Sequence, residues 1–406
     1  MFYIFVFVYT LLPYLYIYTL PLKFILFSIV FFLLLIKNKK LIIVHKHFKH
    51  VIFVFYLLCL LLFKGIVFFQ PIVGYNNLLF GLVIMLSIPS IIRNKKQADG
   101  VINIVIIAVV INSVFCVMEF LHIPIILSIK NTMLAFSLFE LSEKTEFSQW
   151  SFRTSGVYQS VFAFSYVQAL AVPSAYFRIL YSKGNKRKYF FIFCLVVLIL
   201  GLLATSNRSA IIASIIGVYF LSYNTRVSNK LSKLTIIILI TLIIIVIKPL
   251  IETNILFIMS SFDDNDSRLT IWKNVFLVSL DYIFLGLDKD YTQAMLNNPS
   301  FNRELLIGNS VISPHNSVLN ILIRFGLFAA GGYIILIVLS IKDIGLLIKR
   351  KIISREYIIY PVLILCYTIN SFFHNASIVT SIDLWIIMGL MYTNYSFKRS
   401  KIIVYS

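Results

Sequence analysis

Residues 101–120 read VINIVIIAVVINSVFCVMEF, a run that contains one charged residue. A helix that crosses the hydrocarbon core of a bilayer needs about 20 mainly apolar residues, so this run is long enough to span a membrane. The rest of the chain is similar, because 60% of its 406 residues are hydrophobic and 13% are charged. In soluble domains, roughly 45–50% of the residues are hydrophobic and about 25% are charged. The composition therefore excludes a soluble globular protein and predicts an all-α integral membrane protein.

Polar breaks divide the chain into further apolar stretches of similar length. We predict about twelve membrane spans in a single polytopic domain over residues 1–406. The first span has no basic residues before it and no small-residue cleavage site after it, so we expect it to stay in the mature protein. The spans lie near 2–20, 22–36, 51–68, 76–92, 101–120, 157–177, 189–205, 209–222, 234–250, 315–341, 357–374 and 377–395.

The basic residues predict the orientation of these spans, because lysine and arginine in short loops stay on the cytoplasmic side. Six alternate connections contain 24 of the 36 basic residues. Both termini are then cytoplasmic, and the net charge of +20 is mainly a topological signal that also favours anionic lipid headgroups over a nucleic-acid partner. The six connections are 37–50, 93–98, 178–188, 223–233, 342–356 and the tail 396–406.

Two predicted external segments, 121–156 and 251–314, are too long for simple turns. Loops beyond about 15 residues usually have a function or a structure of their own. In the second segment, between spans nine and ten, Ser267 can cap a helix whose apolar residues recur at helical spacing over 269–279. Trp272 suits the headgroup level, so we expect this helix to lie along the membrane surface.

No strong metal site is visible in the sequence. The four cysteines lie singly in apolar sequence, which excludes a disulfide framework or a zinc cluster. Asp264-Asn265-Asp266 has the Asp-x-Asp form that holds a metal on a nucleotide sugar, but nucleotide sugars are cytoplasmic and this loop is predicted to be external. His45, His47 and His50 lack the spacing of a helical metal pair, and we interpret them as headgroup contacts.

Arg208 lies in the short connection between spans seven and eight, on the predicted external side, where cations are disfavoured. A guanidinium binds phosphate oxygens bidentately, so Arg208 is a candidate anion clamp. The alternative is an arginine that snorkels beside a tight turn.

His315 follows Ser313 and Pro314, a pattern typical of a capping serine and a proline at the first helical position. This places His315 in the first turn of the tenth span. A helix N-terminus disfavours an imidazolium and attracts phosphate, so we expect a neutral ring that can accept a proton. A lone histidine at an interface can equally be a polar anchor only. His374, at the outer end of the eleventh span, is a reserve candidate for proton transfer.

Arg324 lies nine residues beyond His315, about 13.5 Å along a helix that rises 1.5 Å per residue. An arginine at that depth in a membrane usually has a function, so we treat Arg324 as a candidate functional residue. Asp383 in the last span is its plausible partner. A purely structural ion pair between the two is the alternative.

The order of these features over residues 150–340 resembles the O-antigen polymerase/ligase superfamily of bacterial cell-surface polysaccharide assembly. In that superfamily the fold is all-helical with a long external loop, and arginines and a histidine serve a glycan linked to a lipid pyrophosphate. Arg324 is a departure, because relatives often have an acidic or neutral residue there. The matching elements are Phe152-Arg153-Thr154-Ser155-Gly156, the Thr-x-x-Arg-Ser/Ala element that ends at Ala210, Arg268 with Trp272 and Gly286, and His315-Asn316 with Gly326.

The resemblance implies a role for each candidate residue. Arg208 and Arg268 match pyrophosphate-binding positions, and His315 matches the position of the catalytic base. No cofactor and no metal are expected. The remaining candidates, as substrate-binding residues, are Arg153, Trp272, Asn316 and Arg324.

A glycosyl transfer outside the cytoplasmic membrane has no nucleotide-activated sugar available, so a lipid pyrophosphate must supply the driving force. We therefore expect an inverting polymerase of undecaprenyl-pyrophosphate-linked repeat units of an O-antigen, capsule or exopolysaccharide. Its active site would face the periplasm from the bacterial cytoplasmic (inner) membrane. The alternatives are a ligase that delivers the glycan to a lipid A core, and a flippase for lipid-linked oligosaccharides. Expected partners are the lipid-linked glycan, membrane lipids, and chain-length-regulator and flippase proteins, without nucleic acid.

Overall fold

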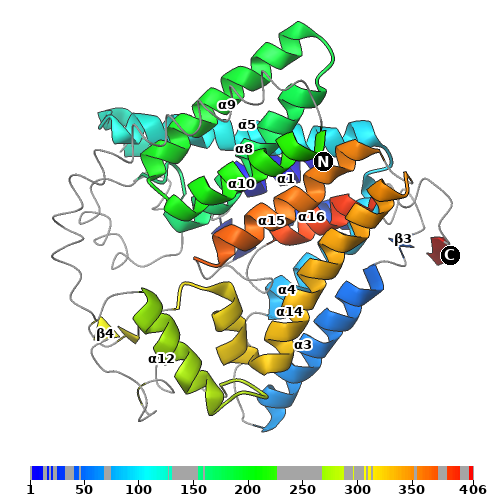
Figure 1. Ribbon diagram of the computed structural model, residues 1–406, viewed down its shortest axis with the longest axis vertical. Coiled ribbons are helices and arrows are strands. Elements are labelled where there is room, and N and C mark those ends of the chain that lie inside the picture. The colour runs from blue at the N-terminus through cyan, green and yellow to red at the C-terminus, as the bar shows by residue number, and fades with distance from the viewer. Residues whose placement is uncertain are drawn as a thin grey trace.

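The structure, a computed structural model, has a mainly helical architecture (Figure 1). Its longer helices form one bundle around a common apolar core. The residues that it describes are 2–11, 16–17, 20–21, 25–32, 41–44, 47–67, 75–126, 128–129, 154–158, 161–225, 268–287, 296, 306–307, 310–311, 314–351, 354–373, 382–393 and 402–405.

Helices occupy most of the predicted spans, and the span expected at 234–250 lies outside the described residues. Among the described residues, three helices are long and apolar enough to cross a membrane: α5, α9 and α14. This supports a membrane protein, while the number of twelve spans stays a prediction. The helices are α1 (Phe2–Leu11), α3 (Phe48–Val67), α4 (Tyr75–Ile91), α5 (Lys95–Phe120), α8 (Val161–Tyr181), α9 (Asn185–Thr205), α10 (Arg208–Thr225), α12 (Arg268–Leu280), α14 (Ser317–Lys349), α15 (Ile359–Ser371) and α16 (Asp383–Tyr392), with a 3-10 turn at Arg355–Ile358.

Short antiparallel strand pairs add to this helical framework. β3 (Leu41–Val44) pairs with β6 (Ile402–Tyr405), which joins a connection near the N-terminus to the C-terminal tail. The other pairs are hairpins of two residues per strand, which β1 (Tyr16–Ile17) forms with β2 (Leu20–Pro21), and β4 (Leu306–Ile307) with β5 (Ser310–Val311).

Connections that the sequence assigns to one side of the membrane lie together in the structure. Arg178 Nη1 lies 3.2 Å from Asp99 Oδ2, which joins the α8–α9 connection to the start of α5. Lys95 forms an ion pair with Glu356, which adds the α14–α15 connection. The β3–β6 pair likewise joins two connections with the same predicted side. Such grouping is what the predicted topology requires, and the side that faces the cytoplasm stays a prediction.

Cysteine labelling would test that orientation. We expect cysteines that replace Lys186 and Lys349 to resist a membrane-impermeant maleimide in intact cells, because basic connections stay cytoplasmic. Cysteines that replace Asp264 and Asn298 should react. The background should lack Cys59, the exposed native cysteine of the described residues. Reaction of the first two sites in intact cells would invert the orientation and move the proposed site to the other face.

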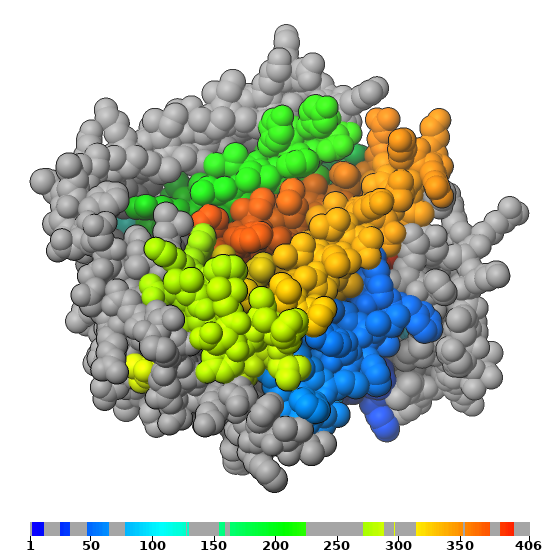
Figure 2. Space-filling view, turned by 60° about the horizontal axis from the view of Figure 1, so that its bottom comes forward, coloured from blue at the N-terminus to red at the C-terminus, as the bar shows by residue number. Residues whose placement is uncertain are grey.

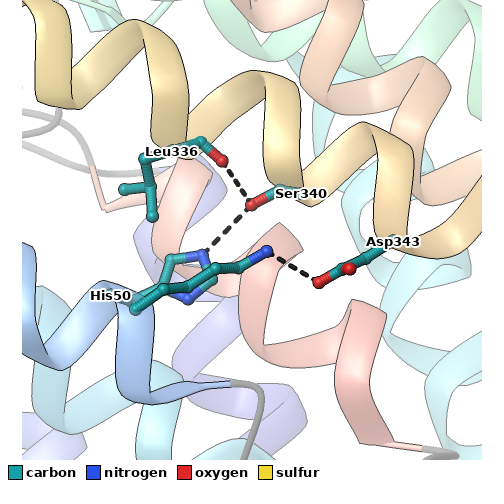
Figure 3. A network of polar contacts seen from close by, with 5 residues as sticks. His50, Leu336, Ser340 and Asp343 are labelled. Atoms are coloured by element: carbon teal, nitrogen blue, oxygen red, sulfur yellow. Dashed lines mark hydrogen bonds and ion pairs between the residues drawn. The ribbon is translucent and has the colours of Figure 1, made fainter.

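A polar network joins α3 to the second half of α14 (Figure 3). Lys49 Nζ donates to Asp343 Oδ2 over 2.8 Å. The Ser340 hydroxyl donates to Leu336 O over 2.7 Å and lies 3.3 Å from His50 Nε2. These contacts hold the two helices together without any residue of the predicted site.

Two histidines at the start of α3 are buried, so the prediction that they contact headgroups is wrong. His47 and His50 are both 0% exposed, and their rings lie 5.0 and 5.8 Å from the ring of Tyr392 on α16. Packing between α3 and α16 removes them from the surface. Burial, with the Lys49 ammonium as a second cause, lowers the pKa of His47 to about 3, so this ring is neutral at physiological pH. His45 lies outside the described residues.

α14 is broken, although the sequence predicted a continuous span. Gly326 has φ 82° and ψ 180°, a conformation that is essentially restricted to glycine. Residues 317–325 therefore form one helical segment and 327–349 another, and the two point in different directions (Figure 1). The expected depth of Arg324 assumed one straight span from His315 onward. The helix instead begins at Ser317, and Arg324 lies in its short first segment, two positions before the break.

Candidate functional site

Residues 268–287 and 317–325, which we call the α12 unit, form a small helical assembly with its own apolar core. Figure 2 shows α12, in yellow-green, packed against α14, in gold, with α3 in blue beside them. The helix predicted over 269–279 is thereby confirmed, and its predicted cap, Ser267, lies outside the described residues. The buried core of the unit consists of Ile271, Val275, Val278, Leu287 and Ile323, with Tyr282, Leu296 and Leu319 packed against it.

Trp272 connects α12 to the start of α14. Its indole Nε1 donates a hydrogen bond to Pro314 O over 2.7 Å, which holds the backbone immediately before His315. Its ring lies 6.3 Å from the ring of Phe373, just beyond the end of α15. One side chain thus joins three segments that are far apart in the sequence. Phe373 also precedes the reserve candidate His374, which itself lies outside the described residues.

His315 precedes α14 and does not lie in its first turn. The helix begins at Ser317, and Asn316 caps it, with Oδ1 accepting from Val318 N at 3.0 Å and Leu319 N at 3.1 Å. The predicted cap at Ser313 is therefore wrong, because the asparagine side chain already pairs the first helical N–H groups. Asn316, a predicted substrate ligand, is buried, and its side-chain oxygen forms this cap.

The backbone at His315 is strained. Its φ is 45°, in the left-handed region, and its side chain is half-buried. Residues other than glycine adopt this region at a cost, and such strain is concentrated at functional sites. The residue immediately precedes Asn316, the N-cap of α14, so it lies at the N-terminal end of this helix.

Arg208 is the first residue of α10, and its side chain is exposed. The turn before it is tight: Ser206 has φ 50°, and Asn207 Oδ1 accepts from Ala210 N at 3.4 Å. A helix N-terminus presents unpaired N–H groups and a partial positive charge. An exposed guanidinium at that position can add a bidentate contact, so the two together suit a phosphate group.

A series of contacts connects the start of α10 to the start of α14. Ser209 Oγ lies 2.6 Å from Asn370 Oδ1, which joins the first turn of α10 to the last turn of α15. Phe373, at the end of α15, contacts the ring of Trp272, which in turn is hydrogen-bonded to Pro314. The predicted anion clamp and the predicted base therefore lie on elements that meet at one end of the bundle.

The segment before α8 reaches the same end. Glu119 Oε2, on α5, accepts from Ser155 N at 3.2 Å and from Gly156 N at 2.9 Å. Thr154 N donates to Ala204 O at 3.3 Å, in the last turn of α9 before the Arg208 turn. Arg153 lies outside the described residues, but the next residue in the chain is held beside that turn.

The part of the chain from α9 to the broken α14, residues 193–334, matches a family model. That family is O-antigen ligase. The match confirms the resemblance to the O-antigen polymerase/ligase superfamily. Members of the O-antigen ligase family are membrane glycosyltransferase-like enzymes, either ligases or polymerases. The matched region, less than half of the chain, contains Arg208, Arg268 and His315, and the comparison with curated proteins gave no match.

For some predicted site residues, the structure describes only the backbone or lacks a description altogether. Arg268 is the first residue of α12, but its side chain is not described. The Arg324 side chain is exposed, and its pairing with Asp383 stays a prediction. The motif Asp264-Asn265-Asp266 lies outside the described residues. The roles assigned to these residues stay predictions.

Sequence reasoning missed three residues that hold the matched region and the segments beside it. Glu119 holds the Ser155-Gly156 backbone, Asn370 connects α15 to α10, and Lys64 bonds to backbone carbonyls at the break in α14. Glu119 and Lys64 could have been found, because each is a charged residue near the predicted outer end of an apolar run, where charges usually have a structural or functional role. Asn370 gave no such signal, because a single amide in an apolar span has many possible partners.

Replacing Trp272 with phenylalanine should separate positioning from stability. One hydrogen bond contributes only about 0.5–1.5 kcal/mol, so thermal stability should change little. A displacement of His315 by about 1 Å can reduce a rate by about a hundredfold. We therefore expect a loss of glycan-transfer rate out of proportion to the loss of stability. Trp385→Phe, a control in the bundle core, should lower stability and preserve the rate of the folded protein. Equal rates for Trp272→Phe and the parent would contradict the positioning role.

Proposed function

We propose that the protein polymerises oligosaccharide repeat units linked to undecaprenyl pyrophosphate, at the outer face of a bacterial cytoplasmic (inner) membrane. The main observation in favour is the series of contacts from the start of α10, through Asn370, Phe373 and Trp272, to the backbone before His315. It supports a single site in which an anion clamp and a base act on the same substrates.

On the donor side, Arg208 and Arg268 bind the pyrophosphate and stabilise the negative charge that develops as it leaves. The N-terminus of α10 adds N–H groups at the position of Arg208. Fixed donors of this kind stabilise a transition state because they need no reorganisation during the reaction. Pyrophosphate departs as a stabilised anion, so this chemistry needs neither a metal nor a general acid.

On the acceptor side, His315 accepts the proton of a sugar hydroxyl. The hydroxyl oxygen forms a bond to the anomeric carbon of the donor glycan, while the bond from that carbon to the pyrophosphate breaks and its electron pair leaves with the phosphate. Attack from the opposite face inverts the anomeric centre. Arg153, Trp272 and Arg324 contact the two glycans, and Asn316 positions the base by capping α14.

A ligase is the second candidate, because the matching family is O-antigen ligase. It would use the same donor and the same residues, and the acceptor would be a lipid A core instead of the next lipid-linked repeat unit. The difference lies in the acceptor alone, so acceptor dependence separates the two activities.

Product analysis with purified protein in proteoliposomes tests the proposal. Lipid-linked repeat units alone should yield a ladder of longer glycans on undecaprenyl pyrophosphate. A product that forms only after addition of lipid A core would indicate the ligase. Absence of any transfer, with movement of a fluorescent lipid-linked oligosaccharide across the vesicle membrane, would indicate a flippase and contradict both transferase proposals.

A further inference from the structure

The break in α14 is closed by backbone from a different part of the chain. Leu287 N donates to Ile323 O over 2.7 Å, and Leu327 N donates to Ile283 O over 2.6 Å. Carbonyls in the last turn before a break, and N–H groups in the first turn after it, have no partner within a helix. The turn 281–287 therefore supplies partners that a continuous α14 would supply itself.

Lys64, in the last turn of α3, pairs further carbonyls at this joint. Its Nζ donates to Arg324 O over 2.7 Å and to Leu287 O over 2.8 Å, and the residue is only 5% exposed. A buried ammonium is costly unless it is hydrogen-bonded, and buried backbone carbonyls also require partners. The ammonium and the two carbonyls thus satisfy one another across three segments.

Two glycines make the close approach of these segments possible. A Cβ at Gly286 would overlap the backbone of Arg324, and a Cβ at Gly326 would overlap the carbonyl of Phe284. Both glycines also have positive φ, 71° and 82°. The joint is therefore a tight contact between two backbones, with the Lys64 ammonium bonded to a carbonyl of each.

We propose that Lys64 is a positioning residue that locks the α12 unit to the helix bundle. The α12 side of the unit has its own small apolar core, whereas Ile321, Leu322 and Phe325 of the segment 317–325 also pack into the bundle core. Lys64 belongs to α3, which lies outside the unit. Within the unit, Arg268 begins α12, and the segment 317–325 directly follows Asn316 and His315. Fixing the joint at the far ends of both helices fixes the direction in which they point. The catalytic consequence rests on the proposed function.

Lys64→Met tests the role by removing the charge and the donors while keeping an unbranched side chain. Because Lys64 is neither the proposed base nor part of the proposed anion clamp, we expect kcat for glycan transfer to fall by about tenfold to hundredfold, with KM for the lipid-linked donor within about threefold of the parent. Lys64→Arg, which retains the charge and N–H donors, should recover part of the rate. Lys342→Met, an exposed lysine of α14, should leave both parameters unchanged.

A spectroscopic distance provides a readout independent of activity. Spin labels at the exposed positions Lys273 on α12 and Tyr219 on α10 should give a narrow distance distribution in a parent without Cys59, and a broad one in Lys64→Met. A pair within the bundle, Tyr189 and Tyr219, should stay narrow in both.

Two results would overturn the positioning role. Broadening of both label pairs would mean that Lys64 supports general stability. A slower reaction with unchanged distances would mean that it contacts the substrate. If the parent transfers no glycan, the proposed function fails, while the label distances still decide whether Lys64 locks the unit.

Discussion

Replacing His315 with alanine is expected to slow glycan extension by about 10²–10⁴-fold, the usual contribution of a general base. Donor binding should be largely retained, because the proposed pyrophosphate contacts come from Arg208, Arg268 and the N-terminus of α10. Glutamine should not rescue the rate. Its amide can hold the hydrogen bond of the acceptor hydroxyl but cannot accept the proton, so this variant separates positioning from basicity.

The measurement is the initial extension rate in proteoliposomes with defined lipid-linked repeat units. His122→Ala is a matched control, because His122 is an exposed histidine just beyond α5 that also has a positive φ, 55° against 45° at His315. It therefore reproduces the change in backbone strain at a position outside the proposed site. Rates within a few-fold of the parent for His315→Ala or His315→Gln would exclude this residue as the base and direct the search to His374.

Arg208→Lys and Arg268→Lys should each remove most of the activity while the protein still inserts normally. Lysine retains the positive charge but loses the planar fork that binds two phosphate oxygens. Loss of one preorganised donor to a transition state typically costs about 10²–10³ in rate. The effect should appear in kcat more than in donor binding, because the charge on the pyrophosphate increases as it leaves.

Arg187→Lys is the matched control for Arg208→Lys. Arg187 is also an exposed arginine in the first turn of a long helix, but it lies at the predicted cytoplasmic end of α9. It should tolerate lysine without a change in rate. If both Arg208→Lys and Arg268→Lys made polymer of full length, neither arginine would be an anion clamp. Both would then be interfacial arginines that snorkel to the membrane surface.

The sequence alone predicted where most helices lie, because the thickness of a bilayer dictates the length of an apolar run. The run 101–120 became α5, Lys95–Phe120, and the run 209–222 became α10, Arg208–Thr225. The extra residues are polar ends that continue a helix beyond its apolar part. Charge in the connections predicted that alternate ends lie on one side of the membrane, and this topology stays a prediction. The pairs of Arg178 with Asp99 and of Lys95 with Glu356 join ends that were assigned to the same side.

The candidate site was predictable only in its residue types and in its order along the chain. Exposed cations and a histidine at predicted outer ends pointed to Arg208 and His315, and the O-antigen ligase match covers both. The contacts between the elements that contain them could not be predicted. These contacts include the one between Ser209 and Asn370 and the hydrogen bond of Trp272 to Pro314.

Tertiary structure decided the break in α14 and the cap before it. A glycine within an apolar run is compatible with a continuous helix, so Gly326 by itself predicts no break. The broken form exists because the turn 281–287 and Lys64 pair the backbone groups that the break releases. The choice of Asn316 over Ser313 as the cap is similar, since Trp272 engages the carbonyl of Pro314. These hydrogen bonds join segments tens to hundreds of residues apart, and local periodicity contains no information about such pairs.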